Sequence, residues 1–194
     1  LCFGAGTSGM GIVRQVFEEM KLQGLSDEEA RSRFYLVDQQ GLLFEDTEGM
    51  TPQQKPYARK RSEFPAGASL DNLEDVVKAI HPTILVGAST AAGAFTREIV
   101  QEMAAHTPRP IIFPLSNPAD LAEASADDLL HWTDGKALVA TGTASRKVVY
   151  HGTIFEIGQA NNSLVFPGMG LAVAACRARK VSPGMLAAAA HALA

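Results

Sequence analysis

Short, uninterrupted apolar runs alternate along this chain with longer segments whose apolar residues recur at helical spacing. Runs such as Thr83–Gly87 and Pro110–Leu115 are typical of parallel strands that are buried on both faces. Segments such as Met10–Gln23 carry apolar side chains every three or four residues, which predicts amphipathic helices. The alternation predicts an α/β domain in which a doubly wound, mostly parallel sheet has helices on both faces.

The same pattern gives bounds for the expected elements. Strands are expected at 1–3, 34–37, 83–87, 110–115 and 137–141, and helices at 10–23, 71–80, 93–105 and 125–132. Ser26-Asp27-Glu28-Glu29 matches a capping box, which predicts one more helix start. The polar segment 39–66 is punctuated by glycine and proline, so we expect it to hold at most one or two short helices.

The C-terminal part of the chain predicts a hairpin followed by two helices. Residues 147–150 and 153–155 flank His151-Gly152, which favours a small β-hairpin near 147–155. An apolar helix is expected over 161–179, interrupted near Pro167-Gly168, and an Ala-rich helix is expected from Pro183 onward. No internal repeat or low-complexity linker divides the sequence, so we expect one domain, residues 1–194.

Composition and charge exclude several functional classes. Hydrophobic residues make up 46% and charged residues 20% of the 194 positions, as in ordinary globular proteins. The formal net charge of −4 argues against a nucleic-acid partner, and no apolar run is long enough for a membrane span. The two cysteines, Cys2 and Cys176, lie far apart, which predicts neither a disulfide framework nor a zinc site. We therefore expect a reducing location: the cytoplasm, or the mitochondrial matrix if the source is eukaryotic.

The loop after the first expected strand has the spacing of a dinucleotide-binding turn. Gly4, Gly6 and Gly9 stand between an apolar strand and an amphipathic helix, with Thr7 and Ser8 between them. In such a turn the first glycine allows the tight bend, the second admits a pyrophosphate and the third lets helix and strand pack closely. A Rossmann-like fold is therefore favoured, with a glycine turn that binds no ligand as the alternative.

An acidic residue ends the second expected strand. Asp38 follows Phe34–Val37, where a carboxylate can accept both adenosine ribose hydroxyls and would repel a 2′-phosphate. Gln39 and Gln40 are uncharged, so the cofactor NAD is favoured over NADP. Two alternatives stay open: an aspartate that merely ends the strand, and basic residues at 55–61 that fold back toward a phosphate.

Small and amide side chains follow the later strands. Ala88 and Ser89 suit close packing against a ribose or nicotinamide, although a plain tight connection fits them almost as well. Asn117 stands directly after a buried strand, where it could bind a ligand or cap the next helix. Asn161 and Asn162 precede the apolar helix and could cap it, bind a polar ligand, or divide those two tasks.

Several motifs occur together in one order along the chain. They are Gly4–Gly11, Leu36–Asp38, Gly41–Leu43, Arg109–Phe113, Leu115–Pro118, Ala140–Gly142, and Asn161-Asn162-Ser163 followed by Phe166-Pro167-Gly168. This ordered set resembles the cofactor-binding domain of malic enzymes, closest to the NAD-linked type, over nearly the whole chain. The resemblance implies oxidative decarboxylation of L-malate to pyruvate and CO2 with NAD and a Mg²⁺ or Mn²⁺ ion in the full-length enzyme.

The resemblance also implies roles for individual residues. The glycine turn with Thr7 and Ser8 would hold the pyrophosphate, and Asp38 the adenosine ribose. Asn117 would contact both the nicotinamide side of NAD and malate. Asn161 and Asn162 would contact the substrate.

In malic enzymes the catalytic Lys and Tyr and the metal-binding carboxylates precede the glycine turn, so we expect no catalytic or metal-binding residue in this chain. We expect the chain to be a fragment of a larger enzyme, inactive on malate by itself, whose full-length form is a homo-oligomer. Two other interpretations stay open. One is the cofactor domain of an amino-acid or folate dehydrogenase, and the other is a non-catalytic, nucleotide-sensing module.

Overall fold

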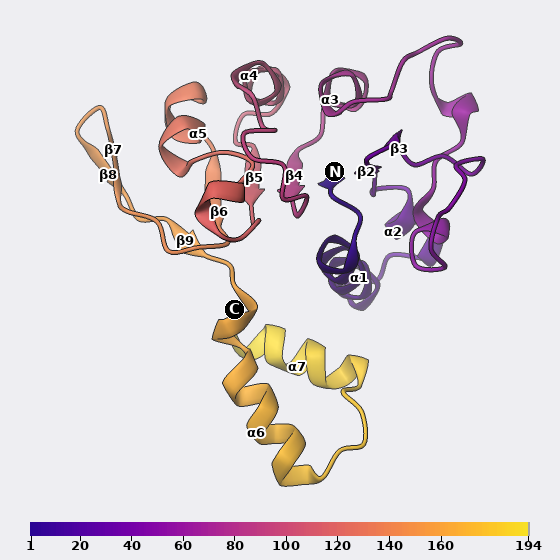
Figure 1. Cartoon of the computed structure of the whole chain (residues 1–194), viewed down its shortest axis with the longest axis vertical. Helices are drawn as coiled ribbons and strands as arrows, with labels where there is room; N and C mark the ends of the chain where they lie inside the picture. The colour runs from indigo at the N-terminus through magenta and orange to yellow at the C-terminus, as the bar shows by residue number, and fades with distance from the viewer. Residues whose placement is uncertain (194) are drawn as a thin grey trace.

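A seven-stranded sheet forms the centre of the computed structural model, which describes residues 1–193 (Figure 1). The strands lie in the order β3-β2-β1-β4-β5-β6-β9. Their bounds are β1 Cys2–Phe3, β2 Leu36–Asp38, β3 Gly41–Leu42, β4 Ile84–Gly87, β5 Ile111–Pro114, β6 Leu138–Thr141 and β9 Gly158–Gln159. All neighbours pair in parallel except β2 and β3, which are antiparallel. The predicted mostly parallel sheet is confirmed.

Helices cover both faces of the sheet, which confirms the doubly wound arrangement (Figure 1). On one face lie α1 (Thr7–Leu22) and α2 (Asp27–Arg31). The other face carries α3 (Leu73–Ile80), α4 (Arg97–His106) and α5 (Ala126–Trp132). Three apolar clusters result among the described residues: one between α1 and the β1–β2 half, one where α3 packs against β2 and β3, and one between α3–α5 and the β4–β6 half.

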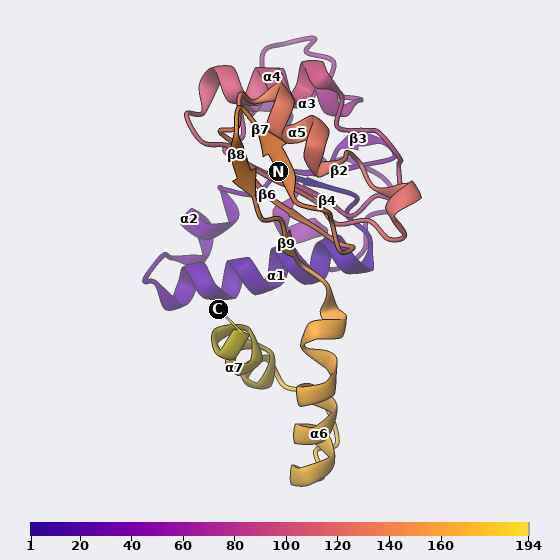
Figure 2. The ribbon, with the colours of Figure 1, turned by 90° about the vertical axis from the view of Figure 1, so that its left-hand side faces the viewer.

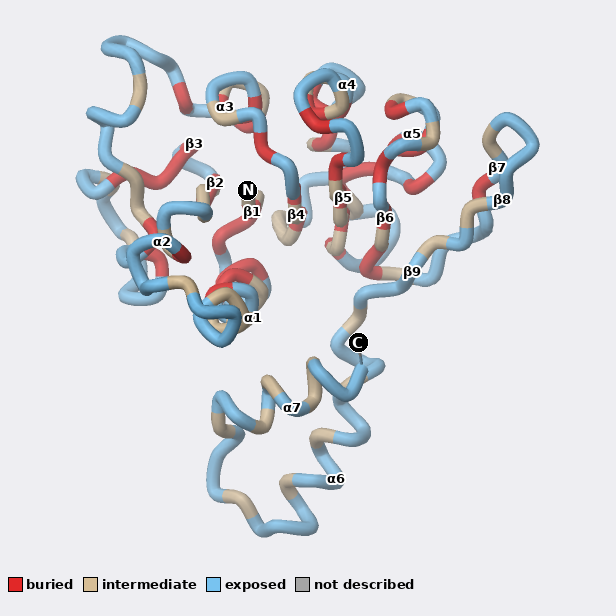
Figure 3. Tube along the Cα trace, turned by 180° about the vertical axis from the view of Figure 1, so that it is seen from behind, coloured by how far each residue is buried: buried red, intermediate tan, exposed pale blue. Residues whose placement is uncertain are grey.

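Burial on the two faces of the β4–β6 half is unequal. Leu85 and Ile112 face the α3–α5 layer and are fully buried. Ile84 and Leu138 point to the opposite face and are 41% and 43% exposed. The expectation that the strand 83–87 is buried on both faces is therefore wrong for Ile84, because α1 and α2 cover only the β1–β2 half of their face (Figure 3).

Several helices begin at residues other than those predicted from hydrophobic periodicity, because local features such as side-chain caps fix their starts. Helix α4 begins at Arg97 and not at residue 93, because the Thr96 hydroxyl accepts the Ile99 N–H. Helix α1 begins at Thr7, three residues before the expected start, since the end of the glycine turn is already helical. The two-residue strands β3 and β9 were not predicted, because so short a strand carries no hydrophobic period.

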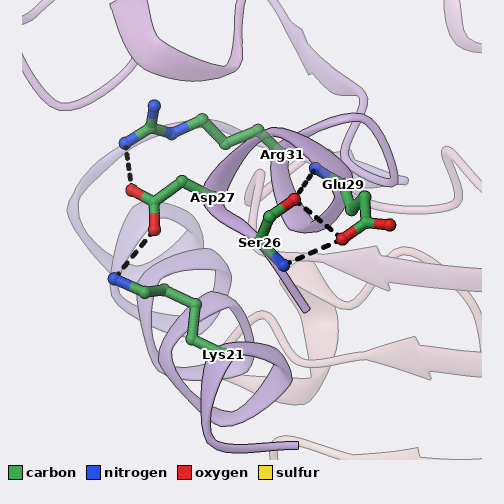
Figure 4. Close-up of polar contacts among 5 residues, drawn as sticks. All are labelled: Lys21, Ser26, Asp27, Glu29 and Arg31. Carbon is green, nitrogen blue, oxygen red and sulfur yellow. Dashed lines mark hydrogen bonds and ion pairs between the residues drawn. The ribbon is translucent and has the colours of Figure 1, made fainter. Parts of the chain in front are cut away.

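The link from α1 to α2 is fixed by the predicted capping box (Figure 4). Ser26 Oγ accepts the Glu29 N–H at 3.2 Å, and Glu29 Oε2 accepts the Ser26 N–H at 2.9 Å. Asp27 lies between Lys21 and Arg31, at 2.9 and 3.1 Å. The hydrogen bonds from Ser26 lower the pKa of Glu29 below its ordinary value of 4.5.

The hairpin and the C-terminal helices extend beyond the main sheet (Figures 1 and 2). Strands β7 (Val148–Tyr150) and β8 (Thr153–Phe155) form the predicted antiparallel hairpin. The interruption expected near Pro167 is confirmed at Val165, and α6 (Phe166–Cys176) begins directly after it with Pro167 in its first turn, where the N–H that proline lacks has no helical partner. A separate 3₁₀ turn occupies Asn162–Leu164, and α7 (Pro183–Leu193) begins at the predicted proline.

Helices α6 and α7 contribute no buried residue among those described, in contrast to the inner faces of α1 and α3–α5 (Figure 3). Helix α7 lies beside α1, where His191 Nε2 is 2.9 Å from Glu19 Oε2. Within residues 1–193, none of the helices is both long enough and apolar enough to cross a membrane.

Candidate cofactor-binding site

The strand order reverses between β1 and β4, so the loops that leave these strands open at a topological switch point. The Ala88 N–H donates to the Phe3 carbonyl at 2.8 Å. The hydrogen bonds between β1 and β4 therefore continue to the carboxyl ends of both strands. The glycine turn after β1 therefore lies beside the Ala88–Ser89 loop. In open α/β sheets this crevice is where ligands bind.

The three glycines of the turn have different surroundings. Gly4 has φ +94°, and a Cβ there would lie 2.5 Å from the Ala88 carbonyl carbon. A Cβ on Gly9 would lie 2.0 Å from the Gly4 carbonyl oxygen. Around Gly6, in contrast, a Cβ would meet no heavy atom within 4 Å. Gly4 and Gly9 are thus required by the turn itself, whereas Gly6 leaves its face open for a ligand's close approach.

The N-terminus of α1 has no side-chain cap. Gly6 occupies the cap position, Thr7 and Ser8 are exposed, and no acidic residue lies in the first turn. Helices α2 to α5 begin instead at side chains that accept a backbone N–H, namely Ser26, Asn72, Thr96 and Ser125. The first N–H groups of α1 and the positive end of its dipole remain available to an anion such as a diphosphate.

Beneath the turn, Cys2 fills the space between strand and helix. Burial raises the pKa of its thiol to about 11, so the group stays neutral at physiological pH.

A cavity of about 270 Å³ opens beside the end of β2. Asp38 and Glu48 supply its two acidic side chains, and no Lys or Arg is among the described residues that line it. Asp38 Oδ1 accepts the Gln39 N–H at 2.9 Å. The cavity is suited to the adenosine end of a dinucleotide, and its charge disfavours a 2′-phosphate.

Two of the basic residues considered as phosphate ligands in segment 55–61, Arg59 and Arg61, are engaged elsewhere. Arg61 pairs with Asp46 at 2.8 Å, and Arg59 pairs with Glu63 while lying over the Tyr35 ring. Neither Arg59 nor Arg61 lines the cavity beside Asp38. The possibility that they fold back toward this cavity is wrong for these two arginines.

Gln54 supports the site and was missed by the sequence analysis. Its side chain is buried, and Nε2 donates to the Ala5 carbonyl at 2.8 Å, which ties the cavity wall to the glycine turn. The two residues are 49 positions apart, and Gln54 lies in a polar segment without hydrophobic period. No local signal in the sequence marks it.

The later loops bring the remaining predicted residues to the same edge of the sheet. Ala88 and Ser89 follow β4 and are half-buried, and Asn117 follows β5 and is exposed. The 3₁₀ turn after it, Ala119–Leu121, has Pro118 at its cap position and no side-chain cap. Asn117 therefore does not serve as a cap, and its amide stays available to a ligand.

Asn161 and Asn162 have different surroundings. Asn161 Nδ2 donates to the Gly142 carbonyl and Oδ1 accepts the Ser163 N–H, both at 2.8 Å. Its amide thus joins the end of β6 to the following 3₁₀ turn, which is the capping role left open by the sequence. Asn162 is exposed. The substrate contacts expected of both residues remain predictions.

Comparison with known proteins identifies the family. The family model described as malic enzyme, NAD binding domain, matches residues 1–194. The chain belongs to the malic enzyme NAD-binding domain family. This membership agrees with the resemblance drawn from the motifs and disfavours the interpretation as an amino-acid or folate dehydrogenase domain.

Individual relatives carry two kinds of name. The malolactic enzyme of Lactiplantibacillus plantarum is 58% identical over 193 residues, which cover 100% of this chain and 35% of that protein. The malolactic enzyme of Leuconostoc mesenteroides is 58% identical, over 98% of this chain and 35% of its own length. NAD-dependent malic enzyme 3 of Bacillus subtilis is 48% identical, with 99% and 35% covered. The chain thus spans about a third of the length of these curated relatives.

One cluster of potential metal ligands occurs among residues 1–193 of this malic enzyme domain: His81, Glu102 and His106. His81 precedes β4 and His106 precedes β5, so the cluster lies at the amino edge of the sheet, opposite the cofactor loops. The two imidazole rings stack at 3.6 Å. A Mg²⁺ or Mn²⁺ ion, which prefers oxygen ligands, is poorly matched to these residues.

Proposed function

We propose that this chain binds NAD for an enzyme that oxidatively decarboxylates L-malate to pyruvate and CO2. The observation that carries the proposal is the open face of Gly6 at the uncapped N-terminus of α1, next to an acidic cavity. Together these features match two parts of NAD's adenosine half: the diphosphate and the ribose hydroxyls. When bound, NAD would accept a hydride from C2 of malate.

Each residue of the site would then have a defined task. The N–H groups at Gly6–Gly9, with Thr7 and Ser8, bind the diphosphate, and Asp38 accepts the adenosine ribose hydroxyls. The Ala88–Ser89 loop lies against the nicotinamide side. Asn117 contacts both the nicotinamide and malate, while Asn161 and Asn162 orient malate at the end of β6.

Groups outside this chain complete the reaction in this proposal. The general base, the general acid and the carboxylates that hold a divalent ion are supplied by other parts of the full-length protein, which is a homo-oligomer. The purified chain by itself is then expected to bind NAD without oxidising malate.

Malolactic activity is a second candidate, favoured by the higher identity to the proteins of that name, 58% against 48% for the malic enzyme of B. subtilis. The two activities differ in products. Oxidative decarboxylation forms pyruvate and one NADH for each malate. Conversion of malate to lactate and CO2 involves no net oxidation and accumulates no NADH. Measuring lactate, pyruvate and NADH formed by the full-length protein separates them.

Substitution of Gly6 tests the NAD site itself. Because a Cβ at Gly6 meets no protein atom, Gly6→Ala should fold normally but obstruct the diphosphate. Calorimetric titration should show NAD affinity reduced by about tenfold or more, which is about 1.4 kcal/mol.

Gly11→Ala is the matched control, since Gly11 lies in the same helix and its Cβ also meets no neighbour. We expect unchanged NAD affinity in this variant. Wild-type affinity in Gly6→Ala, or no NAD binding by the unsubstituted protein, would contradict the proposal.

A further inference from the structure

Glu123 is the one charged side chain among residues 1–193 that is buried, with an exposed fraction of 0%. It lies between the 3₁₀ turn Ala119–Leu121 and α5, and its carboxyl group packs against the end of β4. A Cβ on Gly87 would lie 2.5 Å from Glu123 Cδ. The last residue of β4 must therefore be glycine to leave room for this carboxylate.

Hydrogen bonds from two different loops converge on the carboxylate. Oε1 accepts the Ser89 N–H at 2.9 Å, the Ser89 hydroxyl at 2.8 Å and the Ser116 hydroxyl at 2.5 Å. Oε2 faces the Ser116 N–H at 3.4 Å. Glu123 thereby joins the loop after β4 to the loop after β5, and burial without these donors would be strongly unfavourable.

The same connection extends to a residue in a strained backbone conformation. Thr90 has φ +57°, a left-handed conformation that is unfavourable for a β-branched residue. Its N–H donates to the Ser116 hydroxyl at 2.9 Å, and that hydroxyl in turn donates to Glu123. Strained residues that persist are held by their surroundings and cluster at ligand sites.

We propose that Glu123 is a positioning residue that holds the Ser89–Thr90 and Ser116–Asn117 segments in one geometry for the nicotinamide half of NAD. This inference rests on the proposed NAD-binding function. The adenosine half is assigned to the β1–β2 side by Gly6 and Asp38, so the nicotinamide half lies across the switch point, over β4 and β5. Glu123 is fully buried and acts through Ser89 and Ser116.

Fixing both loops before the cofactor arrives raises affinity because less ordering is required on binding. The effect should be confined to ligands that reach the β4–β5 side. ADP carries the adenosine and the diphosphate but not the nicotinamide riboside, and it therefore serves as an internal reference for the other half of the site.

Glu123→Gln removes the negative charge on which three hydrogen bonds converge and places an amide N–H group opposite the Ser116 N–H. In calorimetric titrations we expect NAD affinity to fall by about tenfold and ADP affinity to stay within about twofold of wild type. Ser116→Ala, which removes the hydroxyl between Glu123 and Thr90, should weaken NAD binding in the same selective way. If Glu123→Gln does not fold, the NAD and ADP affinities of Ser116→Ala test the inference instead.

Glu74→Gln is the matched control: Glu74 is an exposed carboxylate on α3 that pairs with Lys78, and its variant should bind both ligands like wild type. Wild-type NAD affinity in both Glu123→Gln and Ser116→Ala would overturn this inference but not the proposed NAD-binding function. So would an equal loss of NAD and ADP affinity, which indicates a general structural role. Failure of the unsubstituted protein to bind either ligand would instead overturn the proposed function.

Discussion

At the scale of single residues, we expect one carboxylate, Asp38, to distinguish NAD from NADP. Asp38 ends β2 beside a cavity whose described lining holds a second acid, Glu48, and no basic residue. A 2′-phosphate in this cavity would face negative charge, whereas two ribose hydroxyls can donate to Asp38. Discrimination between NAD and NADP should therefore depend on Asp38.

Asp38→Ala should lower the ratio of NAD affinity to NADP affinity by about tenfold, because attraction for the hydroxyls and repulsion of the phosphate are lost together. Competitive titration with both coenzymes measures this ratio. Glu48→Gln removes the other charge of the cavity and should change the ratio less. An unchanged ratio in Asp38→Ala would show that this carboxylate does not select the coenzyme.

Residues with a local signal were predictable, and those held by distant partners were not. Gly4, Gly6 and Gly9 are identified by their spacing between a strand and a helix. Gln54 and Glu123 are as central to the loops, but Gln54 bonds Ala5, 49 positions away, and Glu123 bonds Ser89, 34 positions away, as well as the nearer Ser116. An isolated polar residue in a polar segment carries no trace of such a contact until the chain is folded.

At the scale of elements, capping interactions decide where helices begin and give one of them a pH dependence. The capping box at Ser26 was predicted correctly because its four residues are adjacent in sequence. The strands β3 and β9 were not predicted, since their pairing with β2 and β6 comes from the tertiary arrangement.

The lowered pKa of Glu29 means that its ionised form stabilises the folded chain. This contribution is present above the ordinary pKa of 4.5 and is lost as the pH falls through the lower, folded-state value. Thermal unfolding at pH 7 should show Glu29→Gln to be less stable than wild type, and the difference should shrink as the pH falls below about 4.5. A difference that is constant over this range would exclude ionisation of Glu29 as its cause.

At the scale of the whole molecule, the sheet order places every predicted cofactor residue at one edge. Asp38 ends β2, Ala88 follows β4 and Asn117 follows β5, yet parallel pairing brings these strand ends to the same side. The sequence predicted this edge because alternating strands and helices imply a parallel sheet. It did not predict the unequal cover of the two faces, which arises because α1 and α2 cover only the β1–β2 half of their face.

A crystal structure of the protein with NAD bound tests the central claim most directly. The diphosphate should lie within hydrogen-bonding distance of the first N–H groups of α1 beside Gly6, with the adenosine ribose hydroxyls on Asp38. The nicotinamide should lie over the loops that follow β4 and β5. NAD bound elsewhere, or bound with its ribose remote from Asp38, would contradict the account.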